Sequence, residues 1–309
     1  MQIGVVIAAR NAAEWIADAI GSVRAQTHRD WRLVVVDDGS EDATAEVAQS
    51  HAGADSRIAI VRQLPAGVSA ARNAGAAALP SGCEALLFLD ADDWLAPHAL
   101  TRLAEPLASD PMAVASAGAC AFVRATDRPG CWPGRVLYPV AGDLLPALLE
   151  ANPFANCGQV LIRAAALRRA GLFSERLAYG EDWELLVRLA LHGPFAALRA
   201  SETPALFVRR RRSGAFLRQA TDPSAAERCT DAIFGNPDVA ARLGDAALRL
   251  ARRRAAAANR WTAGRALLAR GQRGRALAAL GSSLVRRPSF RRAAFLLASA
   301  ALPGFGAAD

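Results

Sequence analysis

Short apolar runs alternate with helix-like stretches over the first 123 residues of the chain. The apolar runs predict strands at about residues 3–8, 32–36, 57–61, 84–89 and 113–123. The stretches between them predict helices at about residues 11–26, 42–51, 67–79 and 97–108. This alternation is typical of an α/β fold with a mostly parallel, nucleotide-binding type of sheet and helices on both faces.

The pattern becomes less regular after residue 123. Residues 126–139 are rich in Pro and Gly and predict a long surface loop. A strand at about 158–163 and a short helix at 164–170 follow. Residues 179–189 then predict an amphipathic helix that begins with two acidic residues.

The last third of the chain predicts an α-helical C-terminal region. Beyond residue 212 the sequence is almost wholly helical to about residue 300, with breaks near residues 235–237, 264, 271 and 287–288. Two or three helical hairpins fit this spacing. We therefore expect two domains, residues 1–215 with the sheet and residues 216–309 with the helices.

Polar residues follow several predicted strands at the point where each strand ends. Asp37 and Asp38 come after the second strand, and Asp90, Asp92 and Asp93 come after the fourth. In sheets of this kind ligands collect beyond the carboxyl ends of the strands. An Asp-x-Asp pair there can present oxygens to a hard cation that also holds a diphosphate. A solvated turn in which Asp93 caps the next helix is the other interpretation.

Two further candidate sites each have both a functional and a purely structural interpretation. Arg72 lies near the start of a predicted helix, where it is either a cation at the rim or a surface residue of an Ala-rich helix. Glu181 and Asp182 begin a predicted helix, where acidic residues interact favourably with the helix dipole. A carboxylate in that position could also serve as a general base in a cleft.

The turn after the first strand excludes some nucleotide-binding classes. Residues 8–11 read Ala-Ala-Arg-Asn, so there is neither a G-x-G-x-x-G fingerprint nor a Walker sequence. This disfavours dinucleotide and P-loop enzymes. It also disfavours a sugar nucleotidyltransferase, which would need a Gly-rich basic loop at this point.

Charge divides the chain into two parts. Residues 1–200 hold 17 Arg against 22 Asp and Glu, whereas residues 201–309 hold 20 against 7, and there is no Lys. The Arg-rich helices indicate a solvated face, or a surface that binds anionic lipid or nucleic acid. Few aromatic residues lie among these arginines, which disfavours nucleic acid.

The remaining composition indicates a cytoplasmic protein. The five Cys are scattered without a Cys-x-x-Cys pair, which favours reduced thiols over disulfides or a zinc site. No basic segment precedes the first apolar run, and no apolar run reaches the length of a membrane span. We expect a cytoplasmic location, with peripheral attachment to the inner face of the membrane as an option for the Arg-rich tail.

Six short motifs together resemble the family 2 inverting glycosyltransferases, which have the glycosyltransferase-A fold. The resemblance covers about residues 1–215 and rests on the order and spacing of the motifs. They are Val5–Asn11, Gln26-Thr27 ahead of Trp31, Val34–Ser40, Gly67–Gly75, Leu89–Asp93 and Glu181–Glu184.

The resemblance implies a role for each of these positions. It implies that Asp182 is the catalytic base, with Glu181 as its neighbour. It implies that Mg²⁺ or Mn²⁺ is bound by Asp90, Asp92 and Asp93. It implies that the nucleotide-sugar donor is bound by Ala8, Arg10, Asp37, Asp38, Arg72, Asp90 and Trp183.

The implied reaction is the transfer of a sugar, of hexosyltransferase type, from a nucleotide sugar to an acceptor hydroxyl with inversion. A UDP-sugar is favoured as donor, and the acceptor is a glycan, a lipid-linked molecule or a protein, as in glycan or cell-envelope polysaccharide synthesis. A homo-oligomer is also an option. A non-catalytic sugar-nucleotide-binding protein with a basic docking tail is the alternative from another functional class.

The sequence departs from the family pattern at two positions. Many relatives have an aromatic residue where Arg10 stands, so the base pocket is expected to differ. Many also carry a His after the last strand of the sheet, whereas residues 209–213 offer only Arg as a cationic side chain. An Arg or a water would then take the place of that His beside the metal and the diphosphate.

Overall fold

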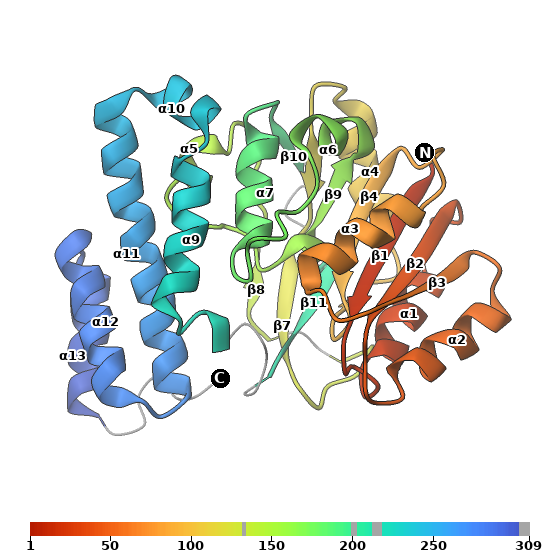
Figure 1. Ribbon diagram of the computed structural model, residues 1–309, viewed down its shortest axis with the longest axis horizontal. Coiled ribbons are helices and arrows are strands. Elements are labelled where there is room, and N and C mark those ends of the chain that lie inside the picture. The colour runs from red at the N-terminus through yellow and green to blue at the C-terminus, as the bar shows by residue number, and fades with distance from the viewer. Residues whose placement is uncertain (132–133, 199–202, 212–217, 303–309) are drawn as a thin grey trace. The chain divides into compact units, whose positions relative to one another are not determined.

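A computed structural model of the chain describes residues 1–131, 134–198, 203–211 and 218–302 (Figure 1). The chain divides into two compact units. The first comprises residues 1–144, 153–175 and 188–210, and the second comprises residues 145–152, 176–187 and 211–309. The units interleave along the sequence, and the expected division into domains at residue 215 stays a prediction.

A seven-stranded sheet forms the centre of the described part of the first unit. Its order is β10-β6-β9-β4-β1-β2-β3. The bounds are β1 Ile3–Ala9, β2 Trp31–Asp38, β3 Ile58–Gln63, β4 Ala85–Asp90, β6 Ala115–Ala117, β9 Val160–Arg163 and β10 Phe195–Ala197. Strand β9 is antiparallel to both of its neighbours, and the other pairings are parallel. The predicted mostly parallel sheet is confirmed.

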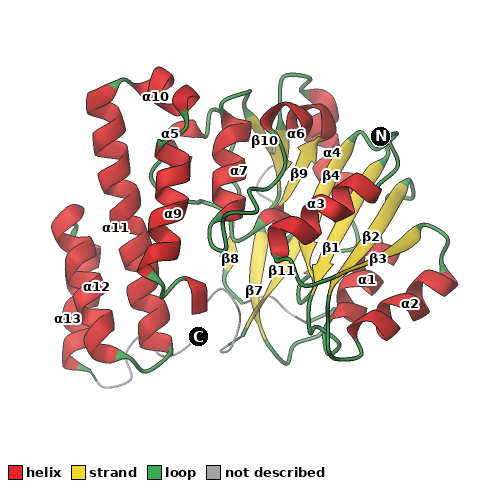
Figure 2. Ribbon diagram, viewed as in Figure 1, coloured by secondary structure: helices red, strands yellow, loops and turns green. Residues whose placement is uncertain are grey.

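Helices cover both faces of this sheet (Figure 2). They are α1 Ile16–Arg24, α2 Thr44–Ala54, α3 Val68–Ala78, α4 Ala99–Ser109 and α6 Ala164–Ala170. Because side chains alternate along a strand, Val35 of β2 joins the core that contains α1 and α4. Its neighbours Val34 and Val36 pack with Ala71 of α3 on the opposite face.

Helix α3 packs on the sheet through a glycine where it crosses β1 and β2. A Cβ at Gly75 would lie 2.3 Å from Cγ1 of Val6 and 3.0 Å from Cγ2 of Val36. Real Cβ atoms do not approach other atoms that closely. The missing side chain therefore sets the distance between α3 and the strands.

A second, smaller sheet was not predicted from the sequence. It has the order β5-β11-β7-β8. Its strands are β5 Trp94–Leu95, β11 Leu206–Arg210, β7 Cys120–Arg124 and β8 Val136–Leu137. The expected single strand at 113–123 is thus wrong, since Gly118 separates β6 of the large sheet from β7 of the small one. The expected loop at 126–139 likewise contains β8.

The second unit is helical in its described part. Its helices are α5 Leu145–Leu148, most of α7 Glu181–Ala190, α9 Pro223–Phe234, α10 Pro237–Leu243, α11 Asp245–Ala269, α12 Arg273–Arg286 and α13 Phe290–Ala301. Gly264 does not break the helix as expected. It lies inside α11, where a Cβ would meet Cγ of Leu280 at 2.6 Å, so this glycine lets α12 pack closely on α11.

All five cysteines are free thiols. Among the described residues, no helix combines the length and the apolar character that crossing a bilayer requires.

Candidate active site

The register of the sheet brings three predicted site residues to one edge. Ala8 of β1 pairs with Val36 of β2 on one side and with Asp90 of β4 on the other. The next residue of β1, Ala9, pairs with Asp37. Because all three strands run parallel, this register places Asp37 and Asp90 on either side of the carboxyl end of β1.

Asp38 is buried and organises the loop before α3. One of its carboxylate oxygens accepts hydrogen bonds from Nε2 of Gln63 and from the backbone N–H of Ala66, both at 2.8 Å. The other oxygen accepts one from the backbone N–H of Gly67 at 2.9 Å. Gly67 has a φ of +96°, a conformation that glycine adopts without strain. Asp38 thus fixes the start of α3 at the edge of the sheet.

Two loops at the same edge are tied together by side chains that the sequence analysis did not single out. The backbone N–H groups of Asn11, Ala12 and Ala13 donate to Ser40, Thr44 and Asp42, at 3.0, 2.8 and 3.1 Å. Hydrogen bonds from Thr44 and from the backbone of Ala13 hold the pKa of Asp42 below its ordinary value, although its partial burial opposes them. The loop after β1, which also carries the exposed Arg10, is thereby fixed to the loop after β2.

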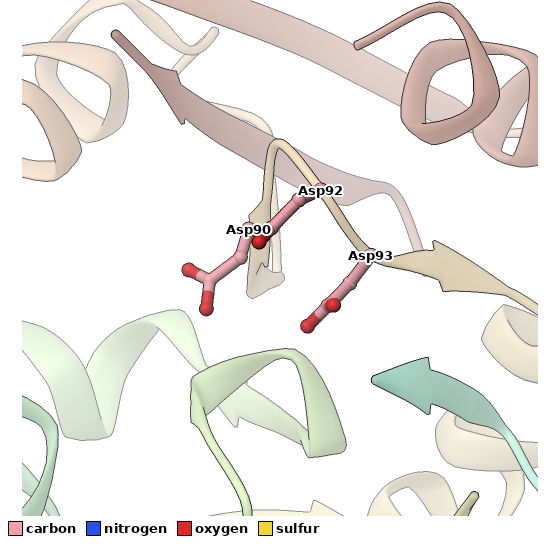
Figure 3. A group of neighbouring side chains, drawn as sticks. All are labelled: Asp90, Asp92 and Asp93. Atoms are coloured by element: carbon pink, nitrogen blue, oxygen red, sulfur yellow. The ribbon is translucent and has the colours of Figure 1, made fainter. Parts of the chain in front are cut away.

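Asp90, Asp92 and Asp93 form an acidic cluster at the end of β4 (Figure 3). Each offers a carboxylate oxygen, and these oxygens all lie within 4.8 Å of one another. Burial raises the pKa of Asp93 well above its ordinary value, and the charges of Asp92 and Asp90 raise it further. Such a group gains most from a cation, because a cation would offset both the lost hydration and the repulsion.

Two neighbours hold the acidic cluster in place. Nη2 of the buried Arg72 donates to Oδ1 of Asp90 at 2.8 Å. Nδ2 of Asn156 lies 3.1 Å from Oδ2 of Asp90 and 2.7 Å from Oδ2 of Asp93. Arg72 was predicted at this rim, whereas Asn156 was missed because no sequence pattern links it to the aspartates.

Arg209 of β11 is buried beside the acidic cluster, and its guanidinium is already engaged by other groups of the protein. Its side chain is 0% exposed and pairs with Asp18 at 2.8 Å. It also donates to the backbone oxygens of Asp92 and Asp127, both at 3.0 Å. The idea that Arg replaces a metal-binding His therefore does not apply to Arg209. Residues 212 and 213 of the same run lie outside the described residues.

The predicted base lies in the second unit, at the start of α7. Oδ2 of Asp182 accepts a hydrogen bond from Nδ2 of Asn152 at 3.3 Å, and Oδ1 accepts one from the backbone N–H of Trp183 at 2.6 Å. The indole N–H of the buried Trp183 donates to the backbone oxygen of Leu148 at 2.5 Å. Trp183 thus anchors α7 to α5, and its contact with a substrate stays a prediction.

Two groups near Asp182, the phenol of Tyr179 and the thiol of Cys229, are held in their neutral forms. Burial raises the pKa of Tyr179 and of Cys229, and the nearby charges of Asp182 and Glu181 raise both further. Both groups therefore stay neutral near pH 7. That Asp182 and Glu181 face the acidic cluster of the first unit stays a prediction.

The N-terminal part of the chain matches a known family. Residues 4–135 match the model of glycosyl transferase family 2. The likeness is to this part of the chain, and the residues after 135 lie outside the matched stretch. The matched stretch contains β1 to β4, the acidic cluster and both loops at the edge of the sheet.

Several curated relatives are named as glycosyltransferases, and one is named for polysaccharide biosynthesis. An uncharacterized glycosyltransferase, alr2836, of Nostoc is 43% identical over 106 residues, which are 34% of this chain and 32% of the relative. The succinoglycan biosynthesis protein ExoU of Rhizobium meliloti is 32% identical over 203 residues, which are 61% of this chain and 57% of the relative. The matched stretches thus span from about a third to somewhat over half of the length of these relatives.

Solved structures share the fold over nearly the whole chain. Residues 1–349 of Staphylococcus aureus TarS in complex with UDP-GlcNAc have a TM-score of 0.64 at 14% identity, with 99% of this chain and 89% of that chain covered. The mannosyltransferase PcManGT of Pyrobaculum calidifontis, in complex with GDP-Man and Mn²⁺, has a TM-score of 0.58 at 20% identity, with 97% and 79% covered. The predicted glycosyltransferase-A-like fold with a helical C-terminal region is confirmed.

Proposed function

We propose that the chain is an inverting glycosyltransferase that moves a hexosyl group from a nucleotide sugar to an acceptor hydroxyl. The observation that carries the proposal is the cluster of three carboxylates, Asp90, Asp92 and Asp93, at the carboxyl edge of a family 2 domain. A UDP-sugar is the favoured donor. UDP-GlcNAc in the TarS complex and GDP-Man in the PcManGT complex support a nucleotide sugar in general.

The acidic cluster suits Mg²⁺ or Mn²⁺ as a cofactor. Its donor set is made of carboxylate oxygens, which such hard cations prefer, and burial, together with the charges of Asp92 and Asp90, raises the pKa of Asp93. Asp90, Asp92 and Asp93 would hold the ion. A bound divalent ion stabilises the negative charge that develops on a departing nucleoside diphosphate.

Donor binding is assigned to the edge of the sheet. A carboxylate has about four acceptor positions, and Asp38 uses three for the loop before α3. One position is left for an N–H of the base. Asp37 lies beside it, and Ala8 and Arg10 lie at the end of β1 and in the loop that follows. Arg72 holds Asp90 in place beside the diphosphate.

Asp182 acts as the general base in this proposal, with Glu181 beside it. Its carboxylate takes the proton from the acceptor hydroxyl as that oxygen attacks the anomeric carbon from the face opposite the diphosphate. A single displacement from the opposite face inverts the configuration. The hydrogen bonds from Asn152 and from the backbone N–H of Trp183 orient the carboxylate.

The substitution Asp182→Asn tests this assignment. Transfer, measured as release of nucleoside diphosphate with a panel of UDP- and GDP-sugars, should fall by about 10²- to 10⁴-fold, while donor affinity measured by calorimetry stays nearly unchanged. Chelation of divalent ions with EDTA should abolish release by the parent protein, and added Mn²⁺ or Mg²⁺ should restore it.

Asp238→Asn is the matched control, because Asp238 is an exposed acidic residue in the first turn of another helix of the second unit. It should leave transfer unchanged. Equal turnover by Asp182→Asn and the parent would refute the assignment. Donor binding by the parent without release in the presence of any acceptor would instead support a non-catalytic binding protein.

The acceptor is proposed from the names of relatives. ExoU is named as a succinoglycan biosynthesis protein and TuaG of Bacillus subtilis as a putative teichuronic acid biosynthesis glycosyltransferase. We therefore propose that the acceptor is a glycan or a lipid-linked glycan of cell-envelope polysaccharide synthesis. Attachment of the Arg-rich region to a membrane surface and homo-oligomer formation are part of the same proposal.

A further inference from the structure

Helix α13 in the second unit has two apolar faces, and only one of them is packed. Phe295 and Leu296 pack against the core of α11 and α12, and the ring centroids of Phe295 and Trp261 are 4.9 Å apart. The other face carries Phe290, Ala294, Leu297 and Ala301, which follow helical spacing and are all exposed. Phe290 is 91% exposed and Leu297 is 69% exposed. Large apolar side chains are rarely left in such a stripe without a partner.

The turn before α13 combines apolar and cationic side chains. Val285, at the end of α12, is 72% exposed. Arg286 and Arg287 follow Val285 directly, and Phe290 and Arg291 are the first two residues of α13. Helix α13 lies along α12 in Figure 1, so the turn and the exposed stripe belong to one continuous part of the second unit.

The segment that contains this surface has no negative side chain. Residues 246–308 hold 13 Arg and no Asp or Glu. Asp231 pairs with Arg252, and Glu150 pairs with Arg254 and Arg287. These two carboxylates leave a large positive excess around the apolar stripe. Apolar side chains among arginines are the composition of helices that lie in a membrane interface.

We propose that α13 and the turn before it dock on an anionic lipid surface, with Phe290, Leu297 and Val285 inserted among the acyl chains. The arginines around them would bind the lipid phosphates. A second copy of the chain fits less well, because two such faces would bring their arginines together. Nucleic acid fits less well because a phosphate backbone offers no partner to Phe290 and Leu297. This inference rests on the membrane attachment included in the proposed function and names the surface that carries it, and its test measures vesicle binding, so its failure is distinguishable from a failure of the transfer activity.

Vesicle binding by the full chain tests the proposal. We expect the chain to sediment with vesicles that contain phosphatidylglycerol and not with pure phosphatidylcholine vesicles. The double substitution Phe290→Asp and Leu297→Asp should lower the partition coefficient by at least about tenfold, because it removes the inserted side chains and adds repulsion. Met112→Asp is the control, since Met112 is an exposed apolar residue of the first unit, and it should leave the partition coefficient unchanged.

Two further measurements make the result unambiguous. The thermal midpoint of the double variant should match that of the parent, because both side chains are exposed, and its oligomeric state by analytical ultracentrifugation should also match. Unchanged vesicle binding by the folded double variant would overturn the proposal. So would equal binding of the parent to neutral vesicles, or a shift from dimer to monomer in the double variant, which would assign the stripe to a second copy.

Discussion

Arg209 shows how one buried side chain can connect several parts of the site. Its guanidinium pairs with Asp18 of α1, donates to the backbone oxygens of two loops, and lies 4.6 Å from the ring centroid of Trp94. Asp93 in turn accepts a hydrogen bond from the backbone N–H of Arg209 at 2.8 Å. The position of the acidic cluster therefore depends on a residue more than a hundred positions later in the chain.

The substitution Arg209→Met should lower the free energy of unfolding by about 2 to 4 kcal/mol, because it leaves Asp18 and two backbone oxygens without their donor. Denaturant unfolding measures this effect. Arg128→Met is the matched control, since Arg128 also approaches Asp18, at 3.7 Å, but its side chain is 50% exposed. It should cost less than about 0.5 kcal/mol, and equal effects of the two substitutions would contradict the account.

The ion pair between Asp55, which follows the end of α2, and Arg57 should make the stability of the protein depend on pH. Hydrogen bonds from Arg57 lower the pKa of Asp55 from 3.8 to about 2, against the effect of its burial. Arg57 itself lies over the ring of Trp31, at 3.7 Å from the centroid. Because the pKa is lower in the folded state, the carboxylate stabilises the fold above pH 3.8, and this contribution is lost as the pH falls towards 2.

Asp55→Asn should therefore cost about 1 to 2 kcal/mol at pH 7, and the difference from the parent should shrink as the pH falls from about 4 to 2. Unfolding by urea at a series of pH values measures it. Asp231→Asn, which removes the exposed pair with Arg252, should have a much smaller effect at pH 7. A cost for Asp55→Asn that does not change with pH would contradict the assignment.

At the scale of single elements, the packing of α3 on the sheet depends on Gly75. Gly75→Ala should lower the free energy of unfolding by about 1 to 3 kcal/mol, since the new methyl group would overlap Val6 and Val36. Gly53→Ala in α2 is the matched control, because nothing lies within 4 Å of a Cβ there. It should stabilise the protein by about 0.5 to 1 kcal/mol, as measured by chemical unfolding. A similar sign for both substitutions would refute the packing argument.

The sequence predicted the elements whose pattern is local. Five strands of the large sheet, β1 to β4 and β9, and the helices near them were found because each is a buried run or an amphipathic stretch of its own. The strands of the small sheet were missed because β5 and β8 have only two residues each and depend on partners far away in the chain. The change of sheet at Gly118 was missed because one continuous apolar run spans it.

The same distinction holds for the candidate site. Asp90, Asp92 and Asp93 were predicted because three carboxylates directly follow an apolar strand, and they lie together in the structure. Asn156, which donates to the cluster, and Asp18, which pairs with Arg209, were missed because they come from distant segments that only the fold brings together. Their residue types carry no signal in the sequence alone. Arg209 was expected as a cation beside the diphosphate and instead supports the cluster from a buried position.

At the scale of the whole molecule, the second unit draws residues from three separate stretches. Arg254 and Arg287 pair with Glu150, and Sγ of Cys229 donates to the backbone oxygen of Gly180 at 3.4 Å. The helices after residue 215 thus provide partners for residues within the preceding sheet-containing sequence. The proposed division into a catalytic domain and a separate helical region has to account for these contacts.

A chain that ends at residue 215 should therefore be much less stable than the parent. We expect a thermal midpoint lower by about 10 °C or more, or aggregation, since several buried contacts are lost together. A chain that ends at residue 302 is the control and should melt like the parent. A fully soluble fragment 1–215 with the parent's midpoint would show that the two regions fold independently.

The position of β9 in the large sheet has a consequence for synthesis of the protein. Strand β9 lies between β4 and β6, although both of them precede it in the chain. Until residues 160–163 leave the ribosome, β4 lacks one neighbour and β6 lacks both, because β10 is made later still, and these strands expose unpaired backbone groups. A nascent chain that pauses before this point would present these unpaired strands to other chains, so slow translation ahead of residue 160 should favour aggregation over native folding.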